Sequence, residues 1–426
     1  MRIRIPGDKS ISQRGLILST LASGESRLRG LLAGADPAST AGALRELGAS
    51  IPPVTEWADP IRVRGLGFQG MRAPKGPLDL ENSGTGARLL MGVLAGQRLD
   101  VVVTGDESLR SRPMMRITSP LSQMGAGFRF LEAEGRLPVQ VRGGDLREMD
   151  YVLPVASAQV KSSILLAGLV AGVPVSLEEP GRSRNHTESM LRAAGVSIVC
   201  EAAGTGWKVS VTAPPKKIDP LDLEIPGDFS SAAFLLVLGL LAPAGSPLVL
   251  EGVGLNPTRA GLLPVLERMG ARIPVEALRG QEQGEPLGDL VVEPAELAGT
   301  RVEGHEIPGL IDEIPVLAVA ASRARGRTVI SGAAELRVKE TDRIRALVEN
   351  FRALGVEVEE REDGLEIQGS GAPLEGRVES FGDHRIAMAF GVLGALPGNR
   401  IQVLGREVVG VSFPGFWNLL EKVKAR

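Results

Sequence analysis

The sequence predicts an α/β protein of two domains, each with its helices inside and its sheets outside. The chain has 426 residues, enough for about two to four domains of ordinary size. Six repeats of similar length follow one another along it, and they are too long for the common solenoid periods. Its 43% hydrophobic residues can form true cores. Three repeats per globular domain is therefore the packing that we expect.

Each repeat opens with a polar or glycine-rich segment, followed by an apolar helical run, a short β-like run and a loop. The six opening segments are IPGDKSIS at Ile5, LENSGTGA at Leu80, VLPVASAQ at Val152, EIPGDFSS at Glu224, EIPGLIDE at Glu306 and ESFGDHRI at Glu379. They begin 72 to 82 residues apart. We expect each repeat to run strand, helix, strand, helix, strand.

A second helix is evident in five of the six repeats, because a small glycine motif closes it before a β-like run. These motifs are LGA at Leu47, MGA at Met124, AGV at Ala194, MGA at Met269 and LGV at Leu354. Glycine adopts the left-handed conformation without steric cost, so these motifs predict helix C-caps.

The domain boundary is expected near residues 218–227, where the proline-rich stretch APPKKIDP precedes the fourth repeat. We predict one domain of residues 9–227 and a second of residues 1–8 with 228–426. Two such domains facing one another would leave a cleft, which is a preferred place for a ligand.

Composition excludes several classes of function. The 48 Lys and Arg residues against 51 Asp and Glu residues give a net charge of −3, so no general basic field would hold a nucleic acid. The single Cys200 forbids an internal disulfide or a multi-cysteine metal site, and its apolar run VSIVC predicts a buried structural thiol. The start MRIRIPGDKSIS lacks a secretory signal, and the run Ala232–Ala242 is too short to span a membrane. We expect a soluble cytoplasmic protein.

The first motif, GDKSISQR, is not a Walker loop, because Asp8 separates Gly7 from Lys9. It places Lys9, Ser10 and Arg14 at a helix start, where free N–H groups and the helix dipole favour an anion. The alternative is a solvated helix start.

The second and third repeats add further polar groups. ENSGTGAR puts small residues where backbone can approach a ligand, and the following SLRSRPMMR supplies Arg110, Arg112 and Arg116. An ordinary arginine-rich surface loop is the alternative. ASAQVKSS and PGRSRNHTE are weak signals by themselves.

The last repeats carry ionisable groups at helix starts. In LRVKETDRIRAL, Lys339 and Arg343 are expected on one helix face with Glu340 alongside, able to hold a polyanion and move a proton. An exposed, salt-bridged helix is the alternative. Asp312, before an apolar run, is either an N-cap or a catalytic carboxylate. GDHRIAMAF places Asp383, His384 and Arg385 at the sixth start.

Together the motifs predict a cleft lined by cations and suited to two anionic substrates. The cations are Lys9, Arg14, Arg112, Lys339, Arg343 and Arg385. Arginine holds a carboxylate or phosphate in bidentate fashion, which accounts for its excess over lysine here.

These motifs resemble those of the 5-enolpyruvylshikimate-3-phosphate synthase family, the 3-phosphoshikimate 1-carboxyvinyltransferases, through all six repeats. GDKSISQR, NSGTGAR, SRP, SAQVKSS, SRNHTE, the Asp before an apolar helix, RVKETDR and GDHR appear in that family's order. The resemblance implies the enolpyruvyl transferase fold, with two inside-out α/β domains of three βαβαββ units each that close on substrate.

The implied reaction transfers the carboxyvinyl group of phosphoenolpyruvate to the 5-hydroxyl of shikimate 3-phosphate and releases phosphate. It proceeds by addition and elimination through a tetrahedral intermediate, in the shikimate pathway to chorismate and the aromatic amino acids. The resemblance also implies a monomer without a metal or organic cofactor, whose partners are these two small molecules, with no nucleic acid and no membrane.

The resemblance assigns the site residues motif by motif. Shikimate 3-phosphate is expected to meet Lys9, Ser10, Arg14, Ser157, Ala158 through its backbone, Gln159, Arg184, Asp312 and Lys339. Phosphoenolpyruvate is expected to meet Lys9, Gly84, Arg112, Gln159, Arg343 and Arg385. Asp312 is expected to accept the hydroxyl proton, and Glu340 with Lys9 to shuttle the proton at C3.

The sequence departs from the family at two positions. Val411 stands where many members carry Lys, and Glu335 where Asn is frequent. Gly84, where enlargement excludes glyphosate in the family, predicts inhibition by glyphosate.

Three alternatives stay open. UDP-N-acetylglucosamine enolpyruvyl transferases share the fold, but they typically carry a Cys in the loop that reads GDESLRSRP here. A non-catalytic anion sensor would lose Lys9, Asp312 and Glu340, and an RNA-processing cyclase would need a nucleophilic His.

Overall fold

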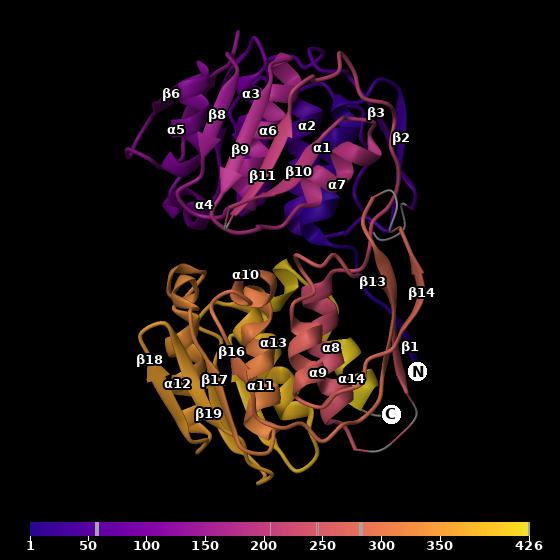
Figure 1. The fold of residues 1–426 in the computed structure, drawn as a ribbon, viewed down its shortest axis with the longest axis vertical. Helices are drawn as coiled ribbons and strands as arrows, with labels where there is room; N and C mark the ends of the chain where they lie inside the picture. Colours follow the sequence, from indigo (N-terminus) through magenta and orange to yellow (C-terminus); the bar gives the residue numbers. More distant parts are fainter. Residues whose placement is uncertain (56–58, 205, 244, 246, 281–283, 425–426) are drawn as a thin grey trace. The chain divides into compact units, whose positions relative to one another are not determined.

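The computed structural model describes residues 1–424 except 56–58, 205, 244, 246 and 281–283. Its contacts divide the chain into two compact units (Figure 1). We call Gly7–Ile225 with Glu282–Glu285 the N-terminal unit, and Met1–Pro6, Pro226–Gln281 and Pro286–Arg426 the C-terminal unit. In the described part of the chain no helix is long and apolar enough to cross a membrane.

The N-terminal unit contains the first three repeats. Its helices are α1 (Lys9–Leu21), α2 (Ala35–Glu46), α3 (Gly84–Ala95), α4 (Glu107–Ser111), α5 (Met115–Met124), α6 (Ala158–Ala171) and α7 (His186–Ala193). Its strands are β2 (Glu25–Arg29), β3 (Ile61–Arg64), β4 (Leu78–Asp79), β5 (Asp100–Thr104), β6 (Gly127–Phe130), β7 (Val139–Arg142), β8 (Met149–Val152), β9 (Val175–Glu179), β10 (Val199–Ala203), β11 (Gly206–Val211) and β12 (Asp222–Glu224).

The C-terminal unit contains the last three repeats. Its helices are α8 (Phe229–Leu241), α9 (Leu262–Arg268), α10 (Ile307–Leu310), η1 (Ile311–Glu313), α11 (Ile314–Arg323), η2 (Ala334–Val338), α12 (Arg343–Ala353), α13 (His384–Ala395), η3 (Arg406–Val411) and α14 (Phe416–Lys424). Its strands are β1 (Arg2–Arg4), β13 (Leu248–Gly254), β14 (Val275–Arg279), β15 (Leu287–Val292), β16 (Arg301–Val302), β17 (Arg327–Ile330), β18 (Val358–Arg361), β19 (Gly364–Gln368), β20 (Glu375–Glu379) and β21 (Arg400–Leu404).

One sheet belongs to each repeat, and each begins with a parallel pair. The strand orders are β12-β2-β3, β4-β5-β7-β6, β8-β9-β11-β10, β1-β13-β15-β14, β16-β17-β19-β18 and β20-β21. In the first and fourth repeats the parallel partner comes from far along the chain, because β12 pairs with β2 and β1 with β13. The chain thus exchanges one strand between its two halves.

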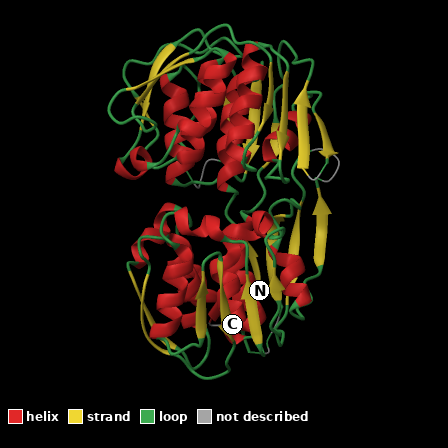
Figure 2. Cartoon of the chain, turned by 60° about the vertical axis from the view of Figure 1, so that its left-hand side comes forward, coloured by secondary structure: helices red, strands yellow, loops and turns green. Residues whose placement is uncertain are grey.

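The first helix of each repeat lies in the core, and the sheets lie outside, which confirms the predicted fold class (Figure 2). Nearly all residues of α1, α3, α6, α8, α11 and α13 are buried. A helix that is apolar on all sides is stable only when it is surrounded. The second helices, such as α5 and α12, bury one face. Cys200 in β10 is half-buried, not buried as predicted, and this partial burial raises the pKa of its thiol.

The glycines after the second helices confirm the predicted C-caps. Their φ angles are 102° at Gly48, 117° at Gly125, 80° at Gly195, 107° at Gly270 and 77° at Gly355. A residue with a Cβ is strained in this region, so glycine fixes where each of these helices ends.

Replacing such a cap should destabilise the protein through backbone conformation alone. A Cβ built at Gly355 meets no atom within 4 Å, yet the φ angle there is 77°. We expect Gly355→Ala to lower the free energy of unfolding by about 1–2 kcal/mol. Gly42, inside α2 with open space around it, is the matched control, and Gly42→Ala should raise stability by about 0.5–1 kcal/mol. Equal effects in urea titrations would contradict this account.

Candidate active site

The start of α1 carries the first predicted cation. Asp8 caps the helix by accepting a hydrogen bond from Ile11 N at 2.8 Å. Lys9 Nζ lies 3.0 Å from Asp36 Oδ2 of α2, and the Lys9 side chain is 31% exposed. Lys9 is therefore held at the helix start by a buried carboxylate, with part of its side chain open to solvent.

Arg14 lies one turn deeper and joins three helices. Its Nη1 donates to Ser10 Oγ, its Nε donates to Thr187 Oγ1 of α7 at 2.8 Å, and its Nη2 donates to Ser162 Oγ of α6 at 3.2 Å. Burial lowers the pKa of Arg14 to about 10, so the guanidinium remains charged near neutral pH. The structure thus brings Ser10 and Arg14 together, with Arg14 buried beneath Ser10.

Gln159, in the first turn of α6, connects a cluster of arginines. Its Oε1 accepts from Arg88 Nη1 at 3.0 Å and from Arg116 Nη2 at 3.4 Å, and its Nε2 donates to Thr85 Oγ1 at 3.1 Å. Arg112 lies nearby, since a Cβ built on Gly84 would be 2.9 Å from Arg112 Nη1 and 3.1 Å from Arg88 Nη1. The resemblance assigned Gly84, Arg112 and Gln159 to phosphoenolpyruvate, and Gln159 to shikimate 3-phosphate as well; Gly84 and Gln159 both lie next to Arg88, and Arg112 lies next to Gly84.

Arg88 is a candidate that the sequence reasoning missed, although it ends the motif ENSGTGAR. Burial, followed by repulsion from Arg116 and Arg112, lowers its pKa to about 9. Among the described residues, the hydrogen bonds of these three arginines go to amide, hydroxyl and carbonyl oxygens. An anion from a substrate would relieve their mutual repulsion.

Other residues predicted to bind shikimate 3-phosphate lie around the same helices. Ser157 is the N-cap residue of α6, and Ala158 is the first residue of that helix. Arg184 lies in the loop between β9 and α7.

A buried ionic cluster fixes this loop to α6. Lys161 is 1% exposed, and its Nζ lies 2.8 Å from Glu179 Oε1 and 2.7 Å from Glu188 Oε1. Glu179 also accepts from Ser183 N at 3.0 Å and from Ser183 Oγ at 2.6 Å. Lys161 thereby connects α6 to the residue before Arg184.

In the C-terminal unit, Arg343 is surrounded by carboxylates. Its Nε lies 2.7 Å from Asp383 Oδ2, its Nη2 2.6 Å from Glu340 Oε2, and its Nη1 3.3 Å from Asp312 Oδ1. Burial alone would lower the pKa of Arg343, but these carboxylates outweigh it and raise the pKa above its usual value. Asp383 also caps α13 by accepting from Arg385 N at 2.8 Å.

The prediction that one helix carries Lys339, Glu340 and Arg343 is wrong. Asp342 caps α12 by accepting from Arg345 N at 3.1 Å, so the helix begins at Arg343 and the two earlier residues precede it. Lys339 Nζ pairs with Glu335 Oε1 at 2.9 Å, so the unusual Glu335 holds this lysine. Val411 ends η3, and its side chain lies outside the described residues.

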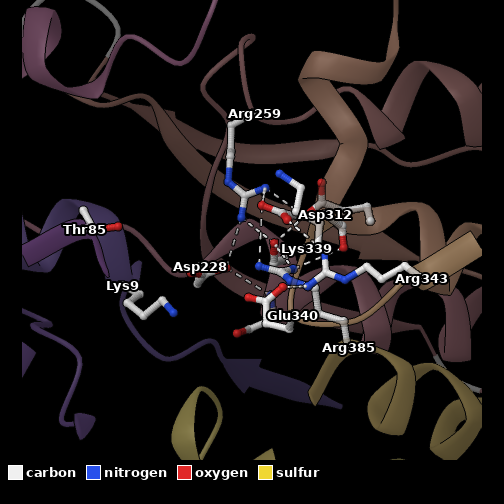
Figure 3. A network of polar contacts seen from close by, with 12 residues as sticks. Lys9, Thr85, Asp228, Arg259, Asp312, Lys339, Glu340, Arg343 and Arg385 are labelled. Carbon is white, nitrogen blue, oxygen red and sulfur yellow. Dashed lines mark hydrogen bonds and ion pairs between the residues drawn. The ribbon is translucent and has the colours of Figure 1, made fainter. Parts of the chain in front are cut away.

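Asp312 lies among three arginines (Figure 3). Its carboxylate is 3.3 Å from Arg343 Nη1, 3.6 Å from Arg385 Nη2 and 3.9 Å from Arg259 Nη1. The N-cap position of α11 falls at Glu313, so the alternative of Asp312 as the N-cap is wrong. Sequence reasoning missed Arg259, whose motif NPTR carries no recognisable signal.

Glu340 is the most exposed carboxylate of this group, with 39% of its side chain accessible. Desolvation would raise its pKa, but Arg343, Arg385 and His384 outweigh that effect and hold the pKa at about 2. In the unliganded protein Glu340 is thus an anion bound to Arg343.

Comparisons with known proteins agree over the whole chain. A family model described as EPSP synthase (3-phosphoshikimate 1-carboxyvinyltransferase) matches residues 1–420. A protein of that name from Gloeobacter violaceus is 49% identical over 423 residues, which cover 99% of this chain and 96% of the relative. One from Desulforamulus reducens is 46% identical over 422 residues, with the same coverage of each.

Solved structures give the same result. EPSP synthase from Acinetobacter baumannii has a TM-score of 0.89 and 40% identity, over 99% of this chain and 95% of that one. The enolpyruvyl transferase NikO from Streptomyces tendae has a TM-score of 0.74 and 18% identity, over 99% and 94%, and this likeness shows the fold alone.

Removing the buried lysine should be costly. Lys161→Met leaves Glu179 and Glu188 without their buried cation, so we expect the free energy of unfolding to fall by about 3–5 kcal/mol. Lys216→Met, at an exposed lysine, is the control and should change stability by less than about 0.5 kcal/mol. Adding Glu188→Gln to Lys161→Met should recover part of the loss. Urea unfolding measures all three, and equal stability of both single variants would refute the role given to Lys161.

Proposed function

The chain belongs to the EPSP synthase family, the 3-phosphoshikimate 1-carboxyvinyltransferases, and on that premise we propose how its residues carry out the reaction. It is an enzyme of the shikimate pathway that transfers the enolpyruvyl group of phosphoenolpyruvate to shikimate 3-phosphate. The observation that carries the residue assignment is the carboxylate of Asp312, which lies among three guanidinium groups.

For shikimate 3-phosphate the proposed ligands are those at the starts of α1 and α6, together with Asp312 and Lys339. Lys9, Ser10 and Arg14 supply charge and a hydroxyl group at the start of α1, where the dipole of a 13-residue helix also favours a phosphate. Ser157, the Ala158 backbone and Gln159 supply neutral hydrogen-bonding groups for the ring hydroxyls. Arg184 assists from the loop that Lys161 anchors.

For phosphoenolpyruvate the proposed ligands are Lys9, Gly84, Arg112, Gln159, Arg343 and Arg385. The cluster of Arg88, Arg112 and Arg116 suits a phosphate, because its described hydrogen bonds leave its positive charge uncompensated. Arg385 suits the carboxylate, which guanidinium groups hold in bidentate fashion. Arg343 would bind it by exchanging its contact with Glu340, because its three nitrogens already contact carboxylates.

The proton transfers fall to Asp312, Glu340 and Lys9. Asp312 accepts the proton of the 5-hydroxyl as its oxygen attacks C2 of phosphoenolpyruvate, while C3 gains a proton from Glu340 or Lys9. In the second step phosphate leaves C2, C3 gives up a proton to the same shuttle, and the vinyl double bond reforms. A substrate carboxylate on Arg343 would share the charge that now holds Glu340 ionised, and so raise the Glu340 pKa toward the range needed for a proton donor.

Arginines aimed at the substrates would also stabilise the transition states. Negative charge increases on the departing phosphate, and each well-directed donor in a site protected from water contributes several kcal/mol, roughly 3–4 for an oxyanion-hole donor. We also propose that the enzyme is a cytoplasmic monomer whose partners are these two small-molecule substrates.

The test follows phosphate release and the vinyl protons by NMR, with phosphoenolpyruvate and either shikimate 3-phosphate or UDP-N-acetylglucosamine. We expect turnover with shikimate 3-phosphate only. Asp312→Asn should reduce kcat by about 10²–10⁴-fold with the fold retained, because it removes the base, and Lys9→Ala should abolish most turnover. Turnover with the nucleotide sugar, or binding without turnover, would overturn the assignment.

Gly84 should control access for phosphoenolpyruvate and for glyphosate. In Gly84→Ala the new Cβ would meet Arg112 Nη1 at 2.9 Å, so this side chain must shift. Because the shift would weaken the proposed hydrogen bond from Arg112 to phosphoenolpyruvate, we expect the KM for phosphoenolpyruvate to rise about 10-fold. The glyphosate inhibition constant should rise by a larger factor. Gly76→Ala, whose Cβ meets nothing within 4 Å, is the control. Wild-type phosphoenolpyruvate kinetics that stay unchanged at saturating glyphosate would disprove this role.

A further inference from the structure

The opening segment of the fourth repeat, EIPGDFSS, has no part in the function proposed above, yet it copies the first. IPGD occurs in both, and Asp228 caps α8 by accepting from Ser231 N at 3.1 Å, as Asp8 caps α1. Over the six residues IPGDKS and IPGDFS the copies differ at one position, because Lys9 is replaced by Phe229, which is 1% exposed in the core. The fourth repeat therefore keeps the hydroxyl of Ser230, equivalent to Ser10, and lacks the cation.

Two other parts of the chain supply the cations. Ser230 Oγ donates to Glu313 Oε1 and accepts from Arg259 Nη2 and from Arg385 Nη1, the last at 2.8 Å. A hydroxyl group has one donor and two acceptor positions, so these three contacts satisfy Ser230. The Ser230 hydroxyl thus connects Arg385, a proposed ligand of phosphoenolpyruvate, to the buried ion pair of Arg259 and Glu313.

That ion pair is fixed by its burial. Arg259 Nη1 lies 2.8 Å from Glu313 Oε1, and their side chains are 6% and 0% exposed. Arg259 comes from the loop between β13 and α9, and Glu313 ends η1, next to Asp312. A buried pair with a shared hydroxyl partner has little freedom to reorient.

We propose that Ser230, held by Arg259 and Glu313, is a positioning residue that sets the orientation of Arg385 toward the carboxylate of phosphoenolpyruvate. This inference rests on the proposed function. Arg385 Nη1 is engaged by Ser230 Oγ and by Asp312 O at 3.2 Å, and these two contacts fix the plane of the guanidinium. Arg385 Nη2 also lies 3.6 Å from Asp312 Oδ2, so Asp312 faces the Nη1–Nη2 edge of the guanidinium. The Nε–Nη2 edge then has the geometry that holds a substrate carboxylate in bidentate fashion.

The test compares Ser230→Ala with Ser231→Ala, a serine one position along the same helix that contributes its backbone N–H to the cap. We expect Ser230→Ala to raise the KM for phosphoenolpyruvate about 10-fold, with the KM for shikimate 3-phosphate and kcat within about threefold of wild type. Ser231→Ala should behave as wild type. A merely structural role would instead lower the melting temperature and affect both substrates alike, and that result would overturn the proposal.

Arg259→Lys is the second variant, because it keeps a cation beside Glu313 but cannot reproduce the planar fork. Like Ser230→Ala, it should raise the KM for phosphoenolpyruvate. An unchanged KM in both Ser230→Ala and Arg259→Lys would refute the positioning role. Turnover of the wild-type enzyme in the same assay tests the proposed function separately, so a failure of one is distinguished from a failure of the other.

Discussion

The site in the C-terminal unit depends on the burial of Arg343 among three carboxylates. A guanidinium removed from water is stable only with compensating charge and hydrogen bonds, and Asp383, Glu340 and Asp312 provide them at 2.6–3.3 Å. These carboxylates come from the start of α13, the loop before α12 and η1. Repeats five and six must therefore pack correctly before Arg343 can be charged and aimed, which makes the catalytic geometry a consequence of the fold.

The polar segments that start the buried helices have different roles in different repeats. Each repeat starts its buried helix with a polar segment, and that start provides free N–H groups and a short side chain directed out of the core. In the N-terminal unit the first and third starts carry Lys9 and Gln159. In the C-terminal unit the fourth start keeps only Ser230, and the arginines arrive from elsewhere. The same type of helix start thus provides proposed substrate ligands in the first and third repeats and holds an arginine in the fourth.

The sequence predicted those features that depend on neighbouring residues. The helix starts and the glycine caps could be predicted because capping acts within about one turn. Features set by distant residues could not. Arg259 contacts Glu313, 54 positions away, and nothing in the motif NPTR indicates that partner. The sequence placed the start of α12 too early, because the spacing of Lys339 and Arg343 is that of one helix face. The helix begins only after Asp342, which is its N-cap residue. Arg88 was missed because its role depends on burial next to two other arginines.

The central claim is that Arg343 is fixed in its working orientation before any substrate arrives. The direct measurement is the NMR order parameter and solvent exchange of the Arg343 Nε–H group, assigned with Arg343→Lys. If Asp383 holds this group as the 2.7 Å contact indicates, the unliganded protein should show a slowly exchanging signal with an order parameter above about 0.8, unchanged by both substrates. A value below about 0.6 that rises only when phosphoenolpyruvate and shikimate 3-phosphate are added would contradict it.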